Sequence, residues 1–231
     1  VVSGRADSAS RYSARADATS KRMNRFRKTS RRPTDFAAQI QAITEALPED
    51  AGEVEVWAMD EHRVGLKPVL KRVWAPIGGS LLADVNPRYD WLYLYAFVHP
   101  SGGDTFWLIL PRVDGVLFSL ALEAFAEWIG AGKQTEIILV VDQAGFHFGK
   151  TVTVPPGIHL LPLPPYSPEL QPAERLWEIA DEPVVNQVFD DIEDMEIVFA
   201  KRCLELMERT EEIKTRTNFH WWQKALRKLA A

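Results

Sequence analysis

Two short runs of apolar residues constrain the fold of this chain more than any other feature. Residues 91–98 read WLYLYAFV, and residues 136–141 read EIILVV. Runs of this length, rich in aromatic and branched aliphatic residues, are typical of strands that are buried on both faces of a sheet. They are far shorter than the roughly 20 apolar residues of a membrane-spanning helix, so we expect no membrane partner. The sequence therefore predicts a sheet that is covered by helices.

The segments around these two runs predict further strands and helices. The helix over residues 114–129 is the clearest, because Asp114 can cap its start and Gly130 marks its end. Its expected apolar face comprises Leu117, Leu120, Ala121, Ala124, Phe125 and Trp128. The other expected strands cover residues 54–60, 69–75, 105–110 and 158–163, and the other expected helices cover residues 35–47, a segment after Pro172, and residues 190–213. This order predicts a mixed α/β domain with a hairpin edge and a crossover helix.

Basic residues are concentrated at the start of the chain. The net charge of the 231 residues is -5, but residues 1–32 carry ten Lys or Arg and two acids, a net charge of +8. The remaining residues carry a net charge of -13. A basic arm ahead of an acidic body is typical of nucleic-acid-binding tails, and the same composition is typical of a disordered segment. The single cysteine, Cys203, excludes an internal disulfide and a Cys-rich zinc site.

Three acidic residues lie where a metal site is expected. Asp60 and Asp142 each follow an apolar strand, and Glu174 lies in the first turn of the helix after Pro172. Each aspartate alone is better explained as a turn residue. Together they favour a site for a hard divalent cation, because ligands bind near the carboxyl ends of strands and Mg²⁺ prefers carboxylate oxygens.

Four segments resemble the catalytic domain of mariner-like insertion-sequence transposases, of the DDE superfamily endonuclease type. They are WAMDEHRVGLKP, KRVWAPIGG, ILVVDQAGFH and LPLPPYSPELQPAERLWEIAD, and the resemblance covers about residues 54–200. The most specific part is PPYSPELQPAERLW, for which the family usually reads PPYSPxLNPxExxW. Two residues depart from the family pattern, because Gln143 and Gln171 stand where the family commonly has Asn.

The resemblance implies an α/β fold, with an RNase H-like mixed sheet flanked by helices and a hairpin insert after the first strand. It also implies DNA strand cleavage at transposon ends that depends on Mg²⁺ or Mn²⁺, followed by transfer of the freed 3′-hydroxyl into target DNA. Two metal ions per site are expected. Carried over by motif, the three ligands and catalytic residues are Asp60, Asp142 and Glu174.

Residues beside these three acids are expected to support them. Glu61 follows Asp60 directly, and consecutive strand residues face opposite sides of a sheet, so only one of the two can be the ligand. The family resemblance implies that this ligand is Asp60. Gln143 and His147 follow Asp142 closely. Two interpretations of His147 stay open: it orients a water or phosphate, or it is a packed loop histidine. The basic residues expected to contact DNA phosphates, and so to make binding salt-dependent, are Arg63, Lys67, Lys71, Arg72 and Lys150.

The expected organisation follows from these motifs. Residues 1–34 are a basic, disordered arm, residues 35–52 a short helix and linker, residues 53–185 the catalytic core, and residues 186–231 C-terminal helices. The expected partners are double-stranded DNA (terminal inverted repeats and target), a second copy of the chain, and a separate helix-turn-helix half, since the arm is too short to be that domain. The expected location is the cytoplasm, at the nucleoid. The alternatives are an inactive or truncated remnant that only binds DNA, and a nuclease that is not a transposase.

Overall fold

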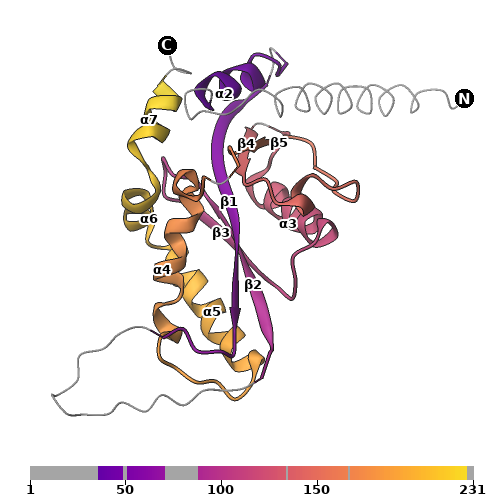
Figure 1. Cartoon of the computed structure of the whole chain (residues 1–231). Coiled ribbons are helices and arrows are strands. Elements are labelled where there is room, and N and C mark those ends of the chain that lie inside the picture. Colours follow the sequence, from indigo (N-terminus) through magenta and orange to yellow (C-terminus); the bar gives the residue numbers. More distant parts are fainter. Residues whose placement is uncertain (1–35, 49–50, 71–87, 134, 166, 228–231) are drawn as a thin grey trace, which may run out of the picture.

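A mixed five-stranded sheet organises the chain in a computed structural model that describes residues 36–48, 51–70, 88–133, 135–165 and 167–227. The strand order is β3-β2-β1-β4-β5 (Figure 1). β1 pairs antiparallel with β2 and parallel with β4, β2 pairs antiparallel with β3, and β4 pairs parallel with β5. The strands are β1 (Glu53–Gly65), β2 (Trp91–Val98), β3 (Thr105–Leu110), β4 (Thr135–Val141) and β5 (Ile158–Pro162). This order confirms the mixed, RNase H-like sheet expected from the sequence.

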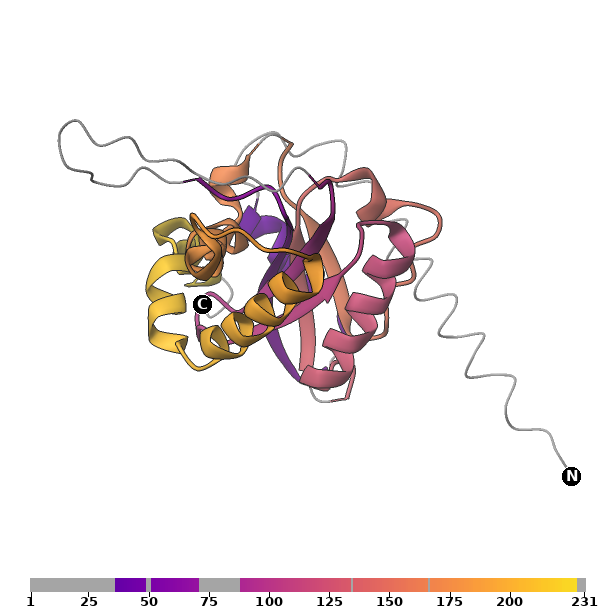
Figure 2. The ribbon, with the colours of Figure 1, turned by 90° about the horizontal axis from the view of Figure 1, so that it is seen from below.

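Helices cover both faces of this sheet, as Figure 2 shows by the opposite positions of α3 and the orange and yellow C-terminal helices. α3 (Gly115–Ile129) packs on one face, against an apolar cluster that includes Trp57, Met59 and Phe97. The other face is covered by α2 (Phe36–Thr44), α4 (Trp177–Ala180), α5 (Ile192–Met207), α6 (Thr210–Thr217) and α7 (His220–Arg227). The short 3₁₀ segments are η2 (Gly145–Phe148), η3 (Pro168–Leu170), η4 (Pro172–Leu176) and η5 (Glu182–Val184).

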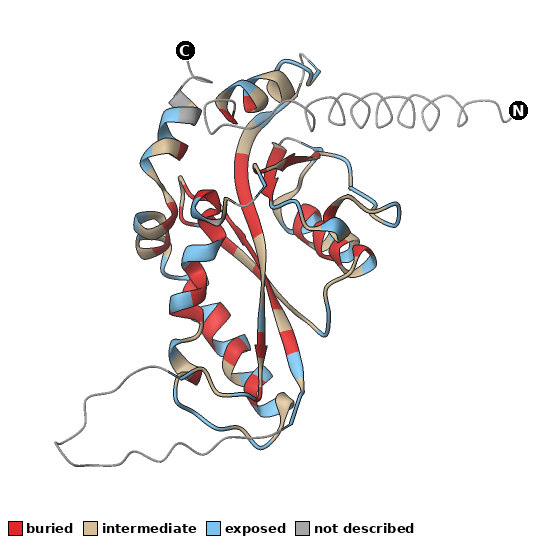
Figure 3. Cartoon of the chain, in the orientation of Figure 1, coloured by how far each residue is buried: buried red, intermediate tan, exposed pale blue. Residues whose placement is uncertain are grey.

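β1 is longer than the sequence predicts, and the prediction that Asp60 ends the strand is wrong. The last β1–β4 pair is Ala58–Val140, whereas β1 continues to pair with β2 as far as Gly65–Trp91. The hydrophobic run ends near Asp60 because β1 no longer pairs with β4 beyond Ala58, and the β1 side chains become partly exposed there. The strand continues because the β2 backbone still bonds to it. Figure 3 shows the change along β1 from buried to partly exposed.

α3 has the predicted ends and a different buried face. The Asp114 carboxylate accepts hydrogen bonds from the backbone N–H groups of Val116 and Leu117, both at 2.9 Å, and Gly130 takes the left-handed conformation at φ 73°. Leu120 and Trp128, predicted to face the core, are 53% and 47% exposed. Apolar residues surround most of this helix, so its periodicity does not settle which side packs. The buried side chains are Phe118, Ala121, Leu122, Phe125 and Ala126.

Two predicted helices are interrupted. The segment after Pro172 is a 3₁₀ turn that leads into the single turn of α4. The helix predicted over residues 190–213 is divided into α5 and α6 where the β2–β3 turn packs against the start of α6. A Cβ atom added to Gly103, whose φ is 92°, would lie 1.9 Å from the carbonyl oxygen of Thr210.

The insert after β1 lies largely outside the described residues. Val69 forms an isolated parallel bridge with Val185, and residues 71–75 of the predicted strand are not described. The basic arm is likewise outside the described part of the chain. Among the described helices, none combines the length and apolarity that crossing a bilayer requires.

Candidate active site

The register of the sheet brings Asp60 and Asp142 to neighbouring strands. Each lies two positions beyond the paired residues Ala58 and Val140, so both aspartates follow the point where β1 and β4 separate. Asp60 is partly buried, whereas the Asp142 side chain is 51% exposed. The two aspartates that the sequence placed at two strand ends therefore lie at neighbouring positions of the sheet.

Glu174 lies on η4, which packs against β1. Its charge adds to the effects that raise the pKa of Asp60. The Gln171 amide nitrogen donates to the carbonyl oxygen of Met59 at 2.9 Å and so fixes the start of η4 beside Asp60. On the same helical segment, the Trp177 indole N–H donates to Asp60 Oδ2 at 3.1 Å. The sequence indicated only a packing role for Trp177, because a motif does not reveal where an indole N–H points.

The electrostatics of Asp60 favour a bound cation. Burial raises its pKa to about 8, with further increases from the charges of Glu61 and Glu174, against the lowering effect of the Trp177 hydrogen bond. None of the described Lys or Arg side chains pairs with Asp60 or Glu174. Crowded carboxylates that have no Lys or Arg partner are suitable donors for a hard divalent cation. In the described ranges, however, no three His, Cys, Asp or Glu side chains are arranged closely enough to hold an ion.

His147 links the two strands through their acidic residues. Its ring is fully buried in η2, with Nε2 2.9 Å from Glu61 Oε1 and Nδ1 2.8 Å from Asp142 Oδ1. Burial opposes the charge on the ring, but the hydrogen bonds to Asp142 and Glu61 raise the pKa of His147 to about 9. The same contact lowers the pKa of Asp142, whereas burial raises the pKa of Glu61. Both ring nitrogens contact carboxylates, so neither is available to a water or a phosphate.

Comparison with known proteins places this geometry in a family. A family model described as DDE superfamily endonuclease matches residues 55–196, which include all three acids. The chain belongs to the DDE superfamily endonucleases. This membership confirms the resemblance found in the sequence and supports a nuclease-type enzyme.

Individual relatives are more distant. Over 106 residues the chain is 34% identical to the uncharacterized protein y4pE/y4sA of Sinorhizobium fredii (strain NBRC 101917 / NGR234), covering 46% of this chain and 77% of that protein. Among solved structures it is similar to the Mos1 strand transfer complex, with 16% identity, a TM-score of 0.48, and coverage of 80% of this chain and 60% of that one. The catalytic domain of the Mos1 mariner transposase gives 16% identity, a TM-score of 0.46, and coverage of 79% and 90%. The chain thus spans about 60% of the transposase in the strand transfer complex.

Both departures from the DDE endonuclease pattern make backbone hydrogen bonds at the edge of the site. The Gln143 amide donates to the carbonyl oxygen of Leu163 at 2.7 Å, next to β5. Gln171 donates to Met59, as described above, and its buried Oε1 has no partner among the described residues. The additional methylene of each Gln lets the amide reach a neighbouring segment, so the two changes are compatible with the arrangement of this site.

The basic residues expected to bind DNA lie in two separate places. Arg63 and Lys67 are exposed at the outer end of the β1–β2 hairpin, with the Arg63 guanidinium 5.5 Å from the centre of the Trp91 ring and the Lys67 ammonium 4.1 Å from the Tyr89 ring. Lys150 is exposed after η2, on the Asp142 side of the site. Lys71 and Arg72 lie outside the described residues. The two ring partners were missed, because the sequence indicates only aromatic residues in or near a strand.

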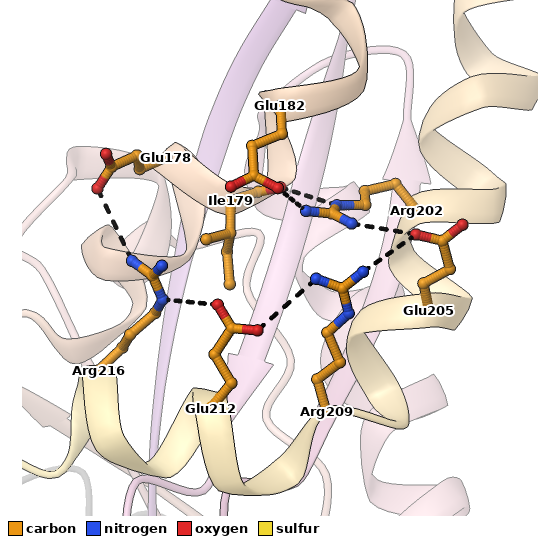
Figure 4. Close-up of polar contacts among 8 residues, drawn as sticks. All are labelled: Glu178, Ile179, Glu182, Arg202, Glu205, Arg209, Glu212 and Arg216. Carbon is orange, nitrogen blue, oxygen red and sulfur yellow. Dashed lines mark hydrogen bonds and ion pairs between the residues drawn. The ribbon is translucent and has the colours of Figure 1, made fainter.

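A chain of ion pairs holds the segment that carries Glu174 against α5 and α6. Arg202, which is 7% exposed, donates to the carbonyl oxygen of Ile179 at 2.8 Å and pairs with Glu182 and Glu205 (Figure 4). The chain continues through surface residues with separations of 3.0–3.8 Å, and these residues are Arg209, Glu212, Arg216 and Glu178. Because Ile179 and Glu182 border α4, the ion pairs fix the direction in which the η4–α4 segment leaves the site.

Replacing Arg202 should weaken the fold more than replacing its exposed neighbour. We expect Arg202→Met to lower the free energy of unfolding by about 1–3 kcal/mol, because the Ile179 carbonyl loses its donor and two carboxylates lose a buried partner. Arg209→Met, a matched control among half-exposed partners, should cost at most about 1 kcal/mol. Urea denaturation of both variants measures the difference. Equal losses would contradict the structural role of Arg202.

Proposed function

We propose that this chain is the catalytic domain of a DDE transposase, which cleaves DNA strands at transposon ends and transfers the freed 3′-hydroxyl into target DNA. The observation that supports the proposal is that, in a chain of the DDE endonuclease family, Asp60 and Asp142 follow the point where β1 and β4 separate, and Glu174 lies on η4, which packs against β1. No protein nucleophile is required, because water and then a 3′-hydroxyl are the attacking groups.

The three carboxylates would hold Mg²⁺ or Mn²⁺, with two ions expected per site. Bound metal would supply the Lewis acid that activates the attacking oxygen and stabilises the leaving oxygen of the phosphodiester. The protein residues do the positioning. Trp177 and the Gln171 bond to Met59 restrain Asp60 from the α4 side. The backbone N–H of Ala144 donates to Asp142 Oδ1 at 2.8 Å and restrains that carboxylate from the other side.

Arg63 and Lys67 would contact DNA phosphates at the hairpin end. The rings beneath them restrict two long side chains in advance, which lowers the entropy lost on binding. We expect the Arg63→Gln/Lys67→Gln double variant to bind duplex DNA more weakly and to reduce the slope of log K against log[salt] by about 1.8, or about 0.9 for each lost phosphate contact.

A double variant of equal charge provides the control for this experiment. Lys133→Gln/Lys201→Gln removes two exposed cations at positions away from the hairpin end. Fluorescence anisotropy at several salt concentrations should show the wild-type slope for this control. The same reduction in both double variants would show that only net charge matters.

The test of the proposed function uses the chain and the DNA that flanks its own gene. A supercoiled plasmid carrying those flanks should be nicked in Mg²⁺ or Mn²⁺ and remain intact in EDTA. Equal nicking of a plasmid without the flanks would identify a nuclease that is not a transposase. Binding without nicking in either metal would identify an inactive remnant.

Adding a second, helix-turn-helix protein from an adjacent reading frame tests the proposed two-part enzyme. Sedimentation on the flank DNA tests the proposed homodimer. Enrichment with the nucleoid tests its location.

A further inference from the structure

A buried contact between Glu61 and His147 lies on the face of β1 opposite to the proposed metal ligand Asp60. Glu61 and Asp60 are consecutive, so they face opposite sides of β1. Asp60 faces the side of α4, where Trp177 contacts it, and Glu61 faces the side of α3, where His147 contacts it. We call the contacts of Glu61, His147 and Asp142 the histidine bridge. It joins the back of β1 to the segment that follows β4.

Packing alone does not explain this bridge. The His147 ring lies among aromatic rings, with centroids 4.5 Å from Phe118 and 4.3 Å from Phe146. An apolar ring would fill this position. The Glu61 side chain is only 7% exposed, and a buried ion pair seldom stabilises a fold more than well-packed apolar residues of similar volume. The bridge therefore has a desolvation cost that a purely structural position does not require.

The geometry of Asp142 indicates what the bridge provides. Its side chain is half exposed, and two donors reach the same oxygen, Oδ1: the Ala144 backbone N–H and His147 Nδ1, both at 2.8 Å. Both donors bind the one oxygen, which leaves Oδ2 without a hydrogen-bond partner among the described residues. The imidazole can hold this position because Glu61 anchors its opposite nitrogen. A carboxylate held through one oxygen presents the other in a defined direction.

We propose that His147, anchored by Glu61, is a positioning residue that orients the Asp142 carboxylate for a divalent cation. The inference rests on the proposed function, since it assumes that Asp142 is a metal ligand. Outer hydrogen-bond partners of metal ligands typically change metal affinity by about 10–100-fold when they are removed. The bridge acts through Asp142, and His147 itself contacts neither metal nor DNA.

The test compares Mn²⁺ binding by the whole chain and its variants, measured from the electron paramagnetic resonance signal of free Mn²⁺. The central variant is His147→Phe/Glu61→Gln, which keeps an aromatic ring and leaves no buried charge unpaired. We expect it to bind Mn²⁺ about 10–100-fold more weakly. Its nicking should recover when the Mn²⁺ concentration is raised by the same factor, so the half-saturating concentration should change more than the maximal rate.

A second histidine–carboxylate pair on the same sheet provides the matched control. His159 Nε2 lies 2.6 Å from Glu136 Oε2, between β4 and β5 and far from the acids in the register. We expect His159→Phe/Glu136→Gln to change thermal stability and to leave Mn²⁺ affinity unchanged. Should the central variant fail to fold, Glu61→Gln alone removes the anchoring charge and should weaken Mn²⁺ binding in the same direction by a smaller factor.

The outcomes separate the two proposals. Wild-type Mn²⁺ affinity in a folded His147→Phe/Glu61→Gln variant, or in Glu61→Gln if only that variant folds, overturns the positioning role and leaves the proposed function intact. A comparable loss of affinity in the His159 control also overturns the positioning role, because the effect would then be a general one. Wild-type protein that binds no Mn²⁺ and nicks no DNA overturns the proposed function together with this inference.

Discussion

Replacing Asp142 by Asn should lower metal-dependent nicking of the flanking DNA by about 1,000-fold or more. Removing one carboxylate from the metal-binding set takes away several kcal/mol of stabilisation in the transition state, and about 4 kcal/mol corresponds to a 1,000-fold change in rate. The amide keeps the shape of the carboxylate and an oxygen that can accept from Ala144 and His147. Since this side chain is half exposed, the variant should fold normally.

The control for this variant is a second exposed acid of the same region. Glu169 lies in η3, five positions before Glu174, and makes no hydrogen bond or ion pair with the described residues. Glu169→Gln should nick at the wild-type rate. A plasmid nicking assay with Mg²⁺ and Mn²⁺, accompanied by a thermal melt of each protein, makes the comparison. Undiminished nicking by Asp142→Asn would remove Asp142 from the site.

Replacing Asp60 by Asn should abolish nicking and at the same time stabilise the metal-free protein. The pKa of Asp60 is about 8 in the folded chain and 3.8 for an ordinary Asp. Between these values the folded state holds a proton that the unfolded state has released, so the free energy of unfolding falls as the pH rises from about 4 to about 8. An amide has no proton to lose. We expect a gain at pH 8 of about 2 kcal/mol, which corresponds to roughly 4–8 °C in a domain of this size.

Thermal melts in EDTA between pH 5 and pH 9 measure this effect. The melting temperature of the wild type should fall across the range, and that of Asp60→Asn should fall less. His147, with a pKa of about 9 against an ordinary 6.5, adds a decline between these two values in both proteins. The difference between the two curves therefore isolates Asp60. Parallel curves would show that Asp60 is ionised in the folded protein at neutral pH.

The strands and helix ends were the most predictable parts of the fold. The strands at residues 91–98 and 105–110 have the predicted ends, because an apolar run followed by a turn leaves the backbone few alternatives. Asp114 and Gly130 bound α3 as predicted, because a cap depends only on residues within one helical turn. The outer half of β1 was not predicted. Its polar residues lack the apolar pattern of a strand, and backbone pairing with β2 maintains the strand there.

The three acids of the site were chosen from the sequence by motif, and their surroundings were not. Contacts of the bridge join residues 86 positions apart, and the Trp177–Asp60 hydrogen bond joins residues 117 positions apart. Such contacts depend on the register of β1 and β4 and on the direction of η2 and η4. A shift of one residue in that register would exchange Asp60 and Glu61 between the two faces of the sheet.

The sequence by itself determined the class of fold, the candidate acidic residues and the family, because each depends on residue type and on spacing along the chain. Only the tertiary structure decided that Asp60 faces α4 while Glu61 faces α3, and that one buried histidine joins Glu61 to Asp142. It also decided which side of α3 is buried. The physical reason is that burial and charge pairing depend on which segments meet in space, so the free energy of those contacts depends on both segments together.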